Sequence, residues 1–226
     1  MHDNIYILIP VFNEEKKIGE VIQSLENSFK NIIVVNDGST DSTEEIVNKT
    51  NAMQIKHIIN LGQGAAISTG FRYIQNLKDA HAVITFDADG QHSVDDAIKF
   101  AHEIKKCDEN IIFGSRFIEN KINIPPLKRF VLSMVTLITN KLTGLNLTDS
   151  HNGLKAYKTN ILKNFEITVN GFAFESQIIG IVGRNKISHK EMPTNTIYTD
   201  YSKKKGQKLR NGLIILEDIF KSFKLK

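Results

Sequence analysis

Cysteine is almost absent from this chain. Cys107 is the only cysteine among 226 residues, and it lies in a polar stretch. A disulfide framework or a cysteine metal cluster within one chain is therefore excluded, and a reducing, intracellular compartment fits best. The start of the chain also lacks the basic residues and long apolar core of a secretory signal, because its first apolar run has only five residues. We therefore expect a cytoplasmic protein.

Long hydrophobic runs are missing as well. A helix that spans a membrane needs about 20 predominantly apolar residues. The nearest candidate, residues 130–147, is interrupted by serine, threonine, asparagine and lysine. This segment could lie on a membrane but should not cross one.

Acidic residues are scarce towards the end of the chain. Lys186–Lys226 holds ten of the 29 Lys and Arg but only four of the 25 Asp and Glu, so residues 1–185 hold 19 and 21. The net charge of +4 is therefore a local feature. A basic end can contact nucleic acid, an anionic membrane surface or phosphorylated substrates, although a solvated face is the commoner explanation. Aromatic residues are not interleaved with these cations, so we expect no nucleic-acid partner.

Short β-branched runs alternate with amphipathic patterns in the first half of the chain. This alternation predicts an α/β fold with a mostly parallel central sheet flanked by helices, in which ligands bind at the carboxyl ends of the strands. The length fits one domain, 1–226, with halves at 1–118 and 119–226. The expected strands are 5–9, 31–35, 55–59, 82–86, 110–113 and 186–191, and the expected helices are 15–27, 41–49, 64–77, 94–106, 130–142, 172–182 and 209–223.

Two carboxylates follow the expected strand 82–86. Asp87 and Asp89 are two residues apart, and Gly90 allows a sharp turn directly after them. Two carboxylates at a strand end can share one Mg²⁺ or Mn²⁺ that also binds phosphate oxygens, because hard divalent ions favour oxygen ligands. An isolated Asp-x-Asp is more often a solvated turn, so its position after an apolar strand carries the prediction.

Polar residues also follow the first two expected strands. Asn13 and Glu14 come after the first strand, and Asp37 comes after the second. These side chains could bind a base and a ribose, although Asn13 could instead cap a helix.

The third expected strand is followed by a glycine pair, Gly62 and Gly64. The pair resembles the start of a dinucleotide fingerprint, but Ile67 stands in place of the third glycine, so an oxidoreductase is a weak interpretation. The glycines either let the backbone approach a nucleotide or start a helix.

Five motifs occur in a characteristic order: Val11–Glu15, Val35–Asp41, Gly62–Ala66, Asp87–His92 and Gly114–Arg116. The pattern resembles family 2 glycosyltransferases of GT-A fold, and it is most similar to the dolichyl- and polyprenyl-phosphate sugar synthases. The similarity is strong over residues 5–118 and looser beyond them. It implies a Rossmann-like, nucleotide-sugar-binding fold and a metal-dependent hexosyltransferase.

The resemblance also implies roles for single residues. The nucleoside and the rest of the donor are expected at Pro10, Asn13, Glu14, Asp37 and Gly64. The diphosphate and Mg²⁺ or Mn²⁺ are expected at Asp87, Ala88, Asp89 and Gln91, of which Asp87, Asp89 and Gln91 are the implied metal ligands. The phosphates are expected near Arg116, Arg129 and Lys155, and catalysis is expected to depend on Asp89, Arg116 and Asp149.

The implied reaction moves a hexose or N-acetylhexosamine from a UDP- or GDP-sugar to a polyprenyl or dolichyl phosphate, with inversion. A phosphate acceptor is already anionic near neutral pH, since its second pKa is about 6, so no strong base is needed. An alternative is transfer to a hydroxyl of a glycan or lipid-linked oligosaccharide, with Asp149 or Glu175 as base. A module that only binds nucleotide sugars is a third interpretation, against which the intact Asp87, Asp89 and Arg116 argue.

The chain departs from the family pattern in three places. Asn36 replaces a frequent aspartate, Gln63 replaces a frequent lysine, and 152–154 replaces a usual Ser-Gly-Phe. The first two departures leave the base and phosphate contacts open, and the third leaves the acceptor side open.

A lipid acceptor is favoured by two segments. The expected helix 130–142 is nearly uncharged, and the expected helix 209–223 is basic and amphipathic. Such a helix can lie on an anionic membrane surface, although core packing explains the same stripe about as well. We expect peripheral contact with the cytoplasmic face of a membrane, and the oligomeric state is left open.

Overall fold

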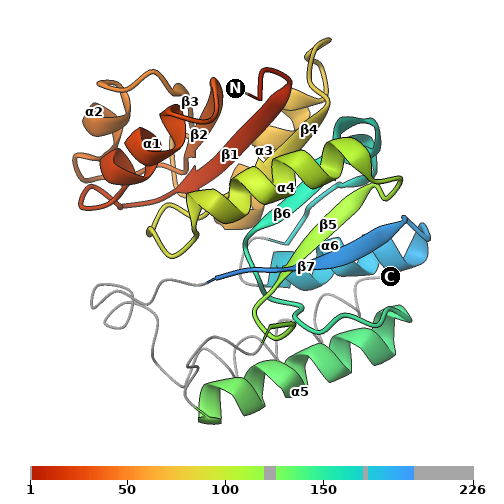
Figure 1. The fold of residues 1–226 in the computed structure, drawn as a ribbon. Coiled ribbons are helices and arrows are strands. Elements are labelled where there is room, and N and C mark those ends of the chain that lie inside the picture. The colour runs from red at the N-terminus through yellow and green to blue at the C-terminus, as the bar shows by residue number, and fades with distance from the viewer. Residues whose placement is uncertain (1, 120–125, 170–172, 196–226) are drawn as a thin grey trace.

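A seven-stranded sheet forms the centre of the molecule. The structure is a computed structural model that describes residues 2–119, 126–169 and 173–195. Figure 1 shows the strands in the order β3-β2-β1-β4-β6-β5-β7. The strands are β1 Ile5–Val11, β2 Asn31–Asn36, β3 Met53–Lys56, β4 Ala82–Thr85, β5 Ile111–Ser115, β6 Lys155–Lys158 and β7 His189–Pro193. The helices are α1 Ile18–Glu26, α2 Thr43–Val47, α3 Gln63–Ile74, α4 Val94–Lys106, α5 Pro126–Thr143 and α6 Ala173–Arg184, with a 3₁₀ helix, η1, at Thr159–Asn164.

The sheet is mostly parallel, as its sequence pattern predicts. β1 lies between β2 and β4 and is parallel to both, and its residues are apolar on both faces. Continuous apolar strands of this kind belong to parallel sheets covered by helices on both sides. Only β6 among the described strands runs antiparallel to its neighbours, β4 and β5.

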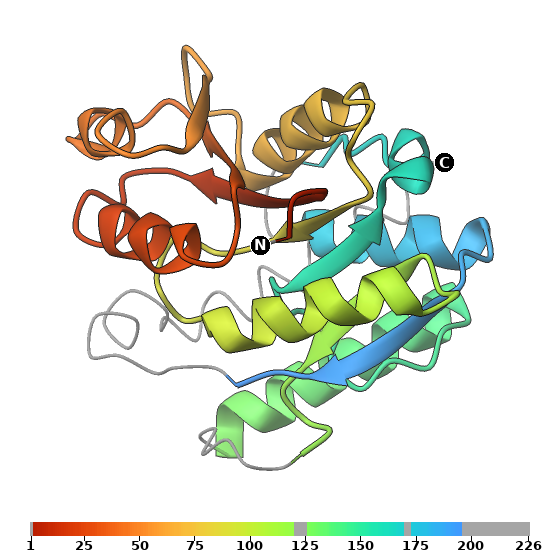
Figure 2. The ribbon, with the colours of Figure 1, turned by 45° about the horizontal axis from the view of Figure 1, so that its top comes forward.

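Helices cover both faces of the sheet (Figures 1 and 2). α1 and α4 pack on one face, where Ile22 and Phe100 join the core beneath β1 and β4. α3 and α6 pack on the other face, where Phe71 and Ile179 lie in a second apolar cluster with Tyr157 of β6. Because β1 is parallel to both β2 and β4, the carboxyl ends of these three strands present their loops along one edge.

Several elements differ from the sequence-based expectation. β3 covers Met53–Lys56 rather than 55–59, and in the described segment after Lys56 only the N–H of His57 still bonds to β2, at the carbonyl oxygen of Asn36. β7 begins at His189 rather than at Lys186, whose φ of +50° closes the turn after α6. β6 was not expected, since its four residues Lys-Ala-Tyr-Lys contain no apolar run. The expected helix 209–223 lies outside the described residues.

α5 packs beside α6 at the lower edge of the molecule in Figure 1. The helix starts at Pro126, a residue favoured in the first turn of helices, and so begins four residues earlier than the apolar pattern predicts. Gly183 of α6 lets the two helices approach closely, because a Cβ there would lie 2.4 Å from the carbonyl oxygen of Thr143. Within residues 2–119, 126–169 and 173–195, no helix is both long and apolar enough to cross a membrane.

Candidate functional site

The loop after β4 holds the two expected carboxylates in fixed orientations. The Oδ2 atom of Asp87 lies 2.8 Å from Nε2 of His92, and the Oδ1 atom of Asp89 accepts a hydrogen bond of 2.9 Å from the backbone N–H of Gln91. The side-chain amide of Gln91 donates to the other oxygen of Asp89. Gly90, with φ of +76°, provides the turn that returns the chain towards Asp89. Gln91 therefore contacts Asp89 directly, and Asp87 lies near enough for its charge to act on Asp89.

The electrostatics of the two carboxyl groups differ. Burial and the neighbouring Asp87 charge raise the pKa of Asp89. Burial also acts to raise the pKa of Asp87, but His92 and the more distant Lys155 and Arg116 outweigh it and hold that pKa below its usual range. A nearby cation would favour the charged form of both groups.

These residues fit a hard divalent ion. They offer two carboxylates and one amide, which are the oxygen donors that Mg²⁺ and Mn²⁺ prefer. The described part of the chain holds no cluster of three or more His, Cys, Asp and Glu side chains suited to a metal. An ion here would therefore complete its shell with phosphate oxygens and water, as Mg²⁺ does in phosphate-transfer sites.

Gly153 lies directly against Asp87. A Cβ at position 153 would lie 2.3 Å from Oδ2 of Asp87, so a side chain there would displace the carboxylate from this position. The backbone of Gly153 is held in place by Thr85, whose hydroxyl donates to its carbonyl oxygen at 2.7 Å. The loop before β6 and the end of β4 therefore define the position of Asp87 together.

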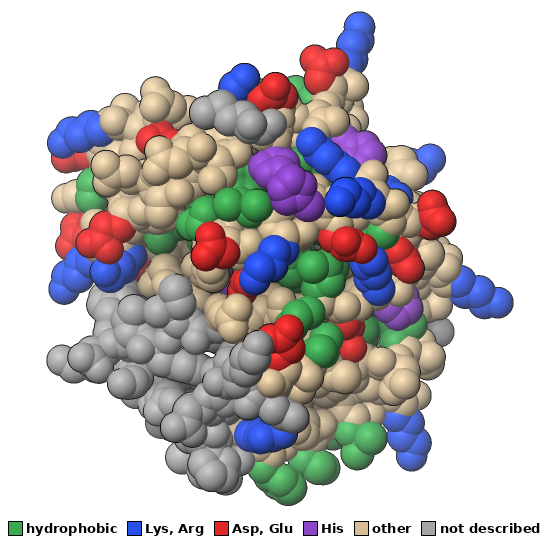
Figure 3. All heavy atoms as spheres, viewed as in Figure 1, with side chains coloured by type: hydrophobic (Ala, Val, Ile, Leu, Met, Phe, Trp, Pro, Cys, Tyr) green, Lys and Arg blue, Asp and Glu red, His purple; other side chains and the backbone are tan. Residues whose placement is uncertain are grey.

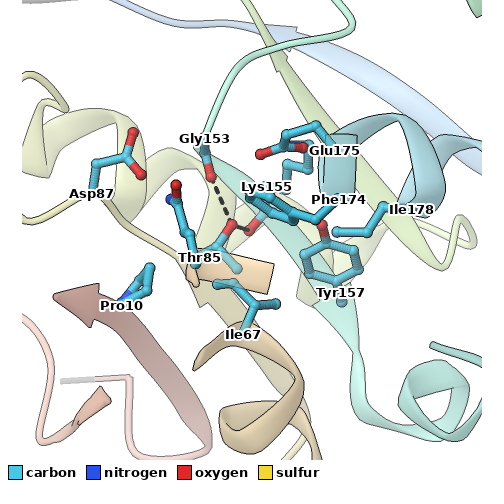
Figure 4. A pocket seen from close by; sticks show the side chains of 11 residues that line it. Pro10, Ile67, Thr85, Asp87, Gly153, Lys155, Tyr157, Phe174, Glu175 and Ile178 are labelled. Atoms are coloured by element: carbon cyan, nitrogen blue, oxygen red, sulfur yellow. Dashed lines mark hydrogen bonds and ion pairs between the residues drawn. The ribbon is translucent and has the colours of Figure 1, made fainter. Parts of the chain in front are cut away.

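A small pocket opens beside Asp87 (Figure 4). It is walled by α3, β4, β6 and α6, and its lining includes Pro10, Thr85 and Ile178. Lys155 forms a buried ion pair with Glu175 in this pocket and also donates to the carbonyl oxygen of Asn152. The charge of Lys155 therefore acts on Asp87 from inside the fold.

Two further groups in the pocket, Glu175 and Tyr157, have raised pKa values. Burial raises the pKa of Glu175 in spite of the opposing charge of Lys155. Burial raises the pKa of Tyr157 well above its usual value, and its hydroxyl has no hydrogen-bond partner within the described structure. In Figure 4 this hydroxyl lies on the side of the pocket that α6 forms with Phe174 and Glu175.

Arg116 and Asp149 form a bidentate pair. Nε of Arg116 donates to Oδ2 of Asp149 at 2.7 Å, and a terminal nitrogen donates to Oδ1 at 2.8 Å. The same guanidinium donates to the carbonyl oxygen of His151 at 2.8 Å. Burial opposes ionisation of Asp149, but Arg116 and the backbone N–H donors hold its pKa below the usual range. Asp149 is therefore an anchor for Arg116 and a weak proton acceptor.

Glu191 of β7 holds the turn that carries Asp149. Its carboxylate accepts hydrogen bonds from the N–H and the hydroxyl of Thr148 and from the N–H of Asp149. The hydroxyl of Ser115 at the end of β5 lies 2.6 Å from that of Thr148. The turn that carries Asp149 is thus fixed between β5 and β7.

Asp37 holds the loop that follows β3. Its Oδ1 lies 2.7 Å from Nδ1 of His57 and accepts from the N–H of Leu61 at 3.0 Å, while its Oδ2 accepts from the N–H of Gly62 at 2.7 Å. Asn13, with φ of +53°, ties the end of β1 to the loop after β2, because its side-chain oxygen accepts from the N–H of Thr40. The ends of β1, β2 and β3 therefore converge as the sequence predicts.

The remaining predicted residues lie in different surroundings. Pro10 lines the pocket beside Asp87, and Glu14 is buried at the end of β1. Ala88 is buried in the core, so only its backbone can face a ligand. Gly64 packs against the segment that precedes α6, since a Cβ there would lie 2.3 Å from the carbonyl oxygen of Val169. Arg129 is exposed in the first turns of α5, with its guanidinium 5.9 Å from the ring centre of Phe117.

Sequence reasoning missed four supporting residues: His57, His92, Gly153 and Glu191. His92 and Gly153 stand inside motifs quoted above, so their positions were visible but their roles were not. His57 and Glu191 contact partners that are far away in sequence, and no local pattern marks them.

Comparisons with known proteins identify the family to which this chain belongs. Residues 6–165 match the model of glycosyl transferase family 2. An uncharacterized protein of Methanocaldococcus jannaschii is 36% identical over 219 residues, which cover 95% of this chain and 90% of that protein. The UDP-N-acetylglucosamine–dolichyl-phosphate N-acetylglucosaminyltransferase of Methanococcus voltae is 35% identical over 233 residues, which cover 93% of this chain and 92% of that enzyme.

A solved structure shares the fold. Glucosyl-3-phosphoglycerate synthase of Mycobacterium tuberculosis, crystallised with Mg²⁺ and UDP, superimposes with a TM-score of 0.70 at 13% identity, covering 97% of this chain and 79% of that one. The expected GT-A fold is therefore confirmed. Together with the match over residues 6–165, these findings show that the chain belongs to glycosyl transferase family 2.

Proposed function

We propose that this chain transfers a hexose or an N-acetylhexosamine from a UDP- or GDP-sugar to a polyprenyl or dolichyl phosphate, and that it requires Mg²⁺ or Mn²⁺. The observation that carries the proposal is the Asp87–Asp89 pair at the end of β4, held by His92 and Gln91 in a family 2 fold. The M. voltae relative, whose name specifies dolichyl phosphate as acceptor, aligns over nearly the whole chain and supports a lipid phosphate.

The donor nucleotide would lie along the carboxyl ends of β1, β2 and β4. Pro10, Asn13, Glu14 and Asp37 would bind the nucleoside, with Gly64 nearby, and Asp87, Asp89, Gln91 and the backbone of Ala88 would hold the metal and the diphosphate. When bound, the ion neutralises charge on the departing nucleoside diphosphate. The sugar would lie beside Asp87, at the mouth of the small pocket whose lining includes the Lys155–Glu175 ion pair.

The acceptor phosphate would approach from the side of Arg116 and Arg129. Both guanidinium groups lie near the ring of Phe117, at 6.0 and 5.9 Å from its centre. Asp149 is paired with Arg116 and has a lowered pKa, so it is poorly suited to remove a proton from a hydroxyl. An acceptor that is already anionic needs no such base, and for this reason we favour a phosphate over a glycan hydroxyl.

Catalysis would then depend on positioning and charge. Arg116, oriented by Asp149, would hold the phosphate oxygen in line with the anomeric carbon, and the site would stabilise the leaving diphosphate. A single displacement of this kind inverts the anomeric configuration.

The acceptor class can be tested with matched lipids. Purified protein would be given a labelled nucleotide sugar, Mn²⁺ and either a polyprenyl monophosphate or the corresponding polyprenol. We expect label in the lipid phase only with the monophosphate. Equal transfer to the free alcohol would overturn the proposed acceptor.

Replacing His92 with phenylalanine is expected to weaken metal binding. The ring would keep its edge contact with Phe86, but Asp87 would lose the imidazole 2.8 Å from its Oδ2. Loss of such an outer partner typically costs about 10- to 100-fold in metal affinity. The measurement is the Mn²⁺ concentration that gives half-maximal transfer. His102→Phe, at an exposed position of α4, is the control, and an unchanged Mn²⁺ requirement in the His92 variant would contradict this role.

Replacing Gly153 with alanine is expected to lower kcat about 100-fold with little loss of stability. The new methyl group would collide with the Asp87 carboxylate, which can rotate away while the fold persists. A displacement of about 1 Å at a reacting centre can cost about 100-fold in rate. The measurements are kcat and the melting temperature, with Gly19→Ala in α1 as the control. Full activity of Gly153→Ala would show that the position of Asp87 is not critical.

A further inference from the structure

The buried side of α5 carries two threonines beside Val135. Its buried face includes Thr136 and Thr139, and the hydroxyl of Thr136 lies 3.0 Å from that of Ser150 and accepts from the N–H of Ser150 at 3.2 Å. These bonds connect the helix to the turn that carries Asp149. They also fix its rotation about its own axis, since turning the helix would leave buried hydroxyl and amide groups without partners.

The outward face of α5 carries a line of exposed apolar side chains, with the small polar Ser133 beside it. Phe130, Met134 and Leu137 are exposed by 65%, 41% and 62%, and their spacing of four and three residues places them on one line. These three residues are called the α5 stripe. In Figure 3, hydrophobic side chains gather along the lower edge of the molecule, where α5 lies. A helix at a water-exposed surface normally shows the opposite arrangement, so the stripe indicates an apolar partner.

The charges around the stripe specify the kind of partner. The 18 residues of α5 include basic side chains but no acidic one. Arg129 precedes the stripe, and Lys141 continues its line four residues after Leu137; both are exposed. An apolar line flanked only by cations is complementary to an anionic lipid surface, in which the cations meet the head groups and the apolar side chains enter the acyl boundary.

The position of the stripe fits the acceptor. The stripe starts next to Arg129, and the guanidinium groups of Arg129 and Arg116 both lie near the ring of Phe117. A lipid whose phosphate reaches these two guanidinium groups must carry its apolar chain away from them, and the α5 stripe is the exposed apolar surface on the adjoining helix. This step rests on the proposed function, because it takes the acceptor to be a polyprenyl phosphate.

We propose that the α5 stripe docks the protein on the surface of an anionic bilayer, so that the Arg116 and Arg129 side of the site faces the lipid head groups. The helix lies in the interface and does not cross it. Docking places the acceptor phosphate, which is confined to the membrane, within reach of the site.

The test compares the full-length wild type with Met134→Gln/Leu137→Gln, since glutamine is a good helix former and both positions are exposed. Binding to vesicles of phosphatidylglycerol and phosphatidylcholine would be measured by flotation. Transfer would be measured with a long-chain polyprenyl phosphate in the same vesicles and with a short, water-soluble prenyl phosphate. Met53→Gln, exposed on β3 at the other edge of the sheet, is the matched control.

We expect the double variant to lose about tenfold or more in vesicle binding. Its transfer to the long-chain acceptor should fall in parallel, while transfer to the soluble acceptor should be retained. Lys141→Glu should weaken binding to anionic vesicles but not to neutral ones, which keeps the proposal testable if the double variant folds poorly.

Two results would overturn the proposal. One is equal flotation of wild type and double variant. The other is a wild type that forms dimers in lipid-free buffer and a double variant that does not, which would make the stripe an interface between two copies. If flotation behaves as expected but neither protein glycosylates any prenyl phosphate, the docking surface stands and the proposed function fails.

Discussion

Replacing Asp89 with asparagine is expected to lower kcat/KM for sugar transfer by at least about 1,000-fold, which corresponds to about 4 kcal/mol of transition-state stabilisation. Asparagine has nearly the same shape and can still accept a hydrogen bond from Gln91, so the loop should keep its conformation. The variant loses the negative charge that would hold the divalent ion against the diphosphate. The variant should therefore bind Mn²⁺ more weakly and stabilise the leaving group less.

The controls for this variant separate charge from folding. The melting temperature should change little, because Asp89 is only half-buried and its pKa is already raised by burial and by Asp87. Asp95→Asn removes an exposed carboxylate from the start of α4 and should leave transfer intact. If Asp89→Asn keeps more than about a tenth of wild-type kcat/KM, the carboxylate pair is not the metal site.

Replacing Arg116 with alanine is expected to abolish transfer and to lower the free energy of unfolding by about 3 kcal/mol or more. The Asp149 side chain is only 1% exposed, so removal of the guanidinium leaves a buried carboxylate without its charged partner. A pair near the surface behaves differently: Lys17 and Glu20 pair at the start of α1, and Lys17→Ala should cost no more than about 0.5 kcal/mol.

A double variant distinguishes the structural role of Arg116 from its catalytic role. Arg116→Ala/Asp149→Ala removes both charges, so part of the lost stability should return. Transfer should not return, because the group that we place at the acceptor phosphate is still missing. Recovery of both stability and transfer in the double variant would show that Arg116 serves the fold alone.

The same pair makes stability depend on pH. Arg116 holds the pKa of Asp149 in the folded protein below its usual value of about 3.9. The pair therefore stabilises the fold fully at pH values above about 3.9, and this contribution is lost as the pH falls through the lower pKa of the folded state. The stability difference between wild type and Asp149→Asn should therefore shrink in acid. Urea unfolding at neutral pH and near pH 3 measures it.

The parts of the fold that sequence reasoning predicted well are those decided locally. β1, β2 and β4 are continuous apolar runs, because their residues are covered by helices on both faces. β6 is different, since Lys155 forms an ion pair with Glu175 and Lys158 donates a hydrogen bond to the carbonyl oxygen of Cys107. Its place between β4 and β5 depends on these tertiary contacts, which four residues of sequence do not encode.

The candidate site divides in the same way. Asp87, Asp89 and Gln91 are neighbours in sequence, so a short motif suffices to group them. Arg116 and Asp149 are 33 residues apart, and their pairing emerges only when β5 and the turn before β6 meet. This pairing also changes the interpretation of Asp149, from a candidate base to the residue that orients Arg116.

The rotation of α5 about its own axis could not be predicted from the sequence either. Its apolar pattern predicts a helix but not which side faces the protein, and the side that carries Thr136 faces inwards, where Ser150 offers this threonine hydrogen-bond partners.

The most direct test of the central claim is transfer by the purified protein with metal removed and then restored. Labelled UDP- and GDP-sugars would be incubated with polyprenyl monophosphate after treatment with a chelator, and lipid-bound label would be counted before and after addition of Mn²⁺ or Mg²⁺. We predict no lipid-bound label without metal, and transfer from one class of donor once metal is restored. Full transfer in the chelated sample would contradict the metal site at Asp87 and Asp89, and absence of donor binding under every condition would contradict the proposed function as a whole.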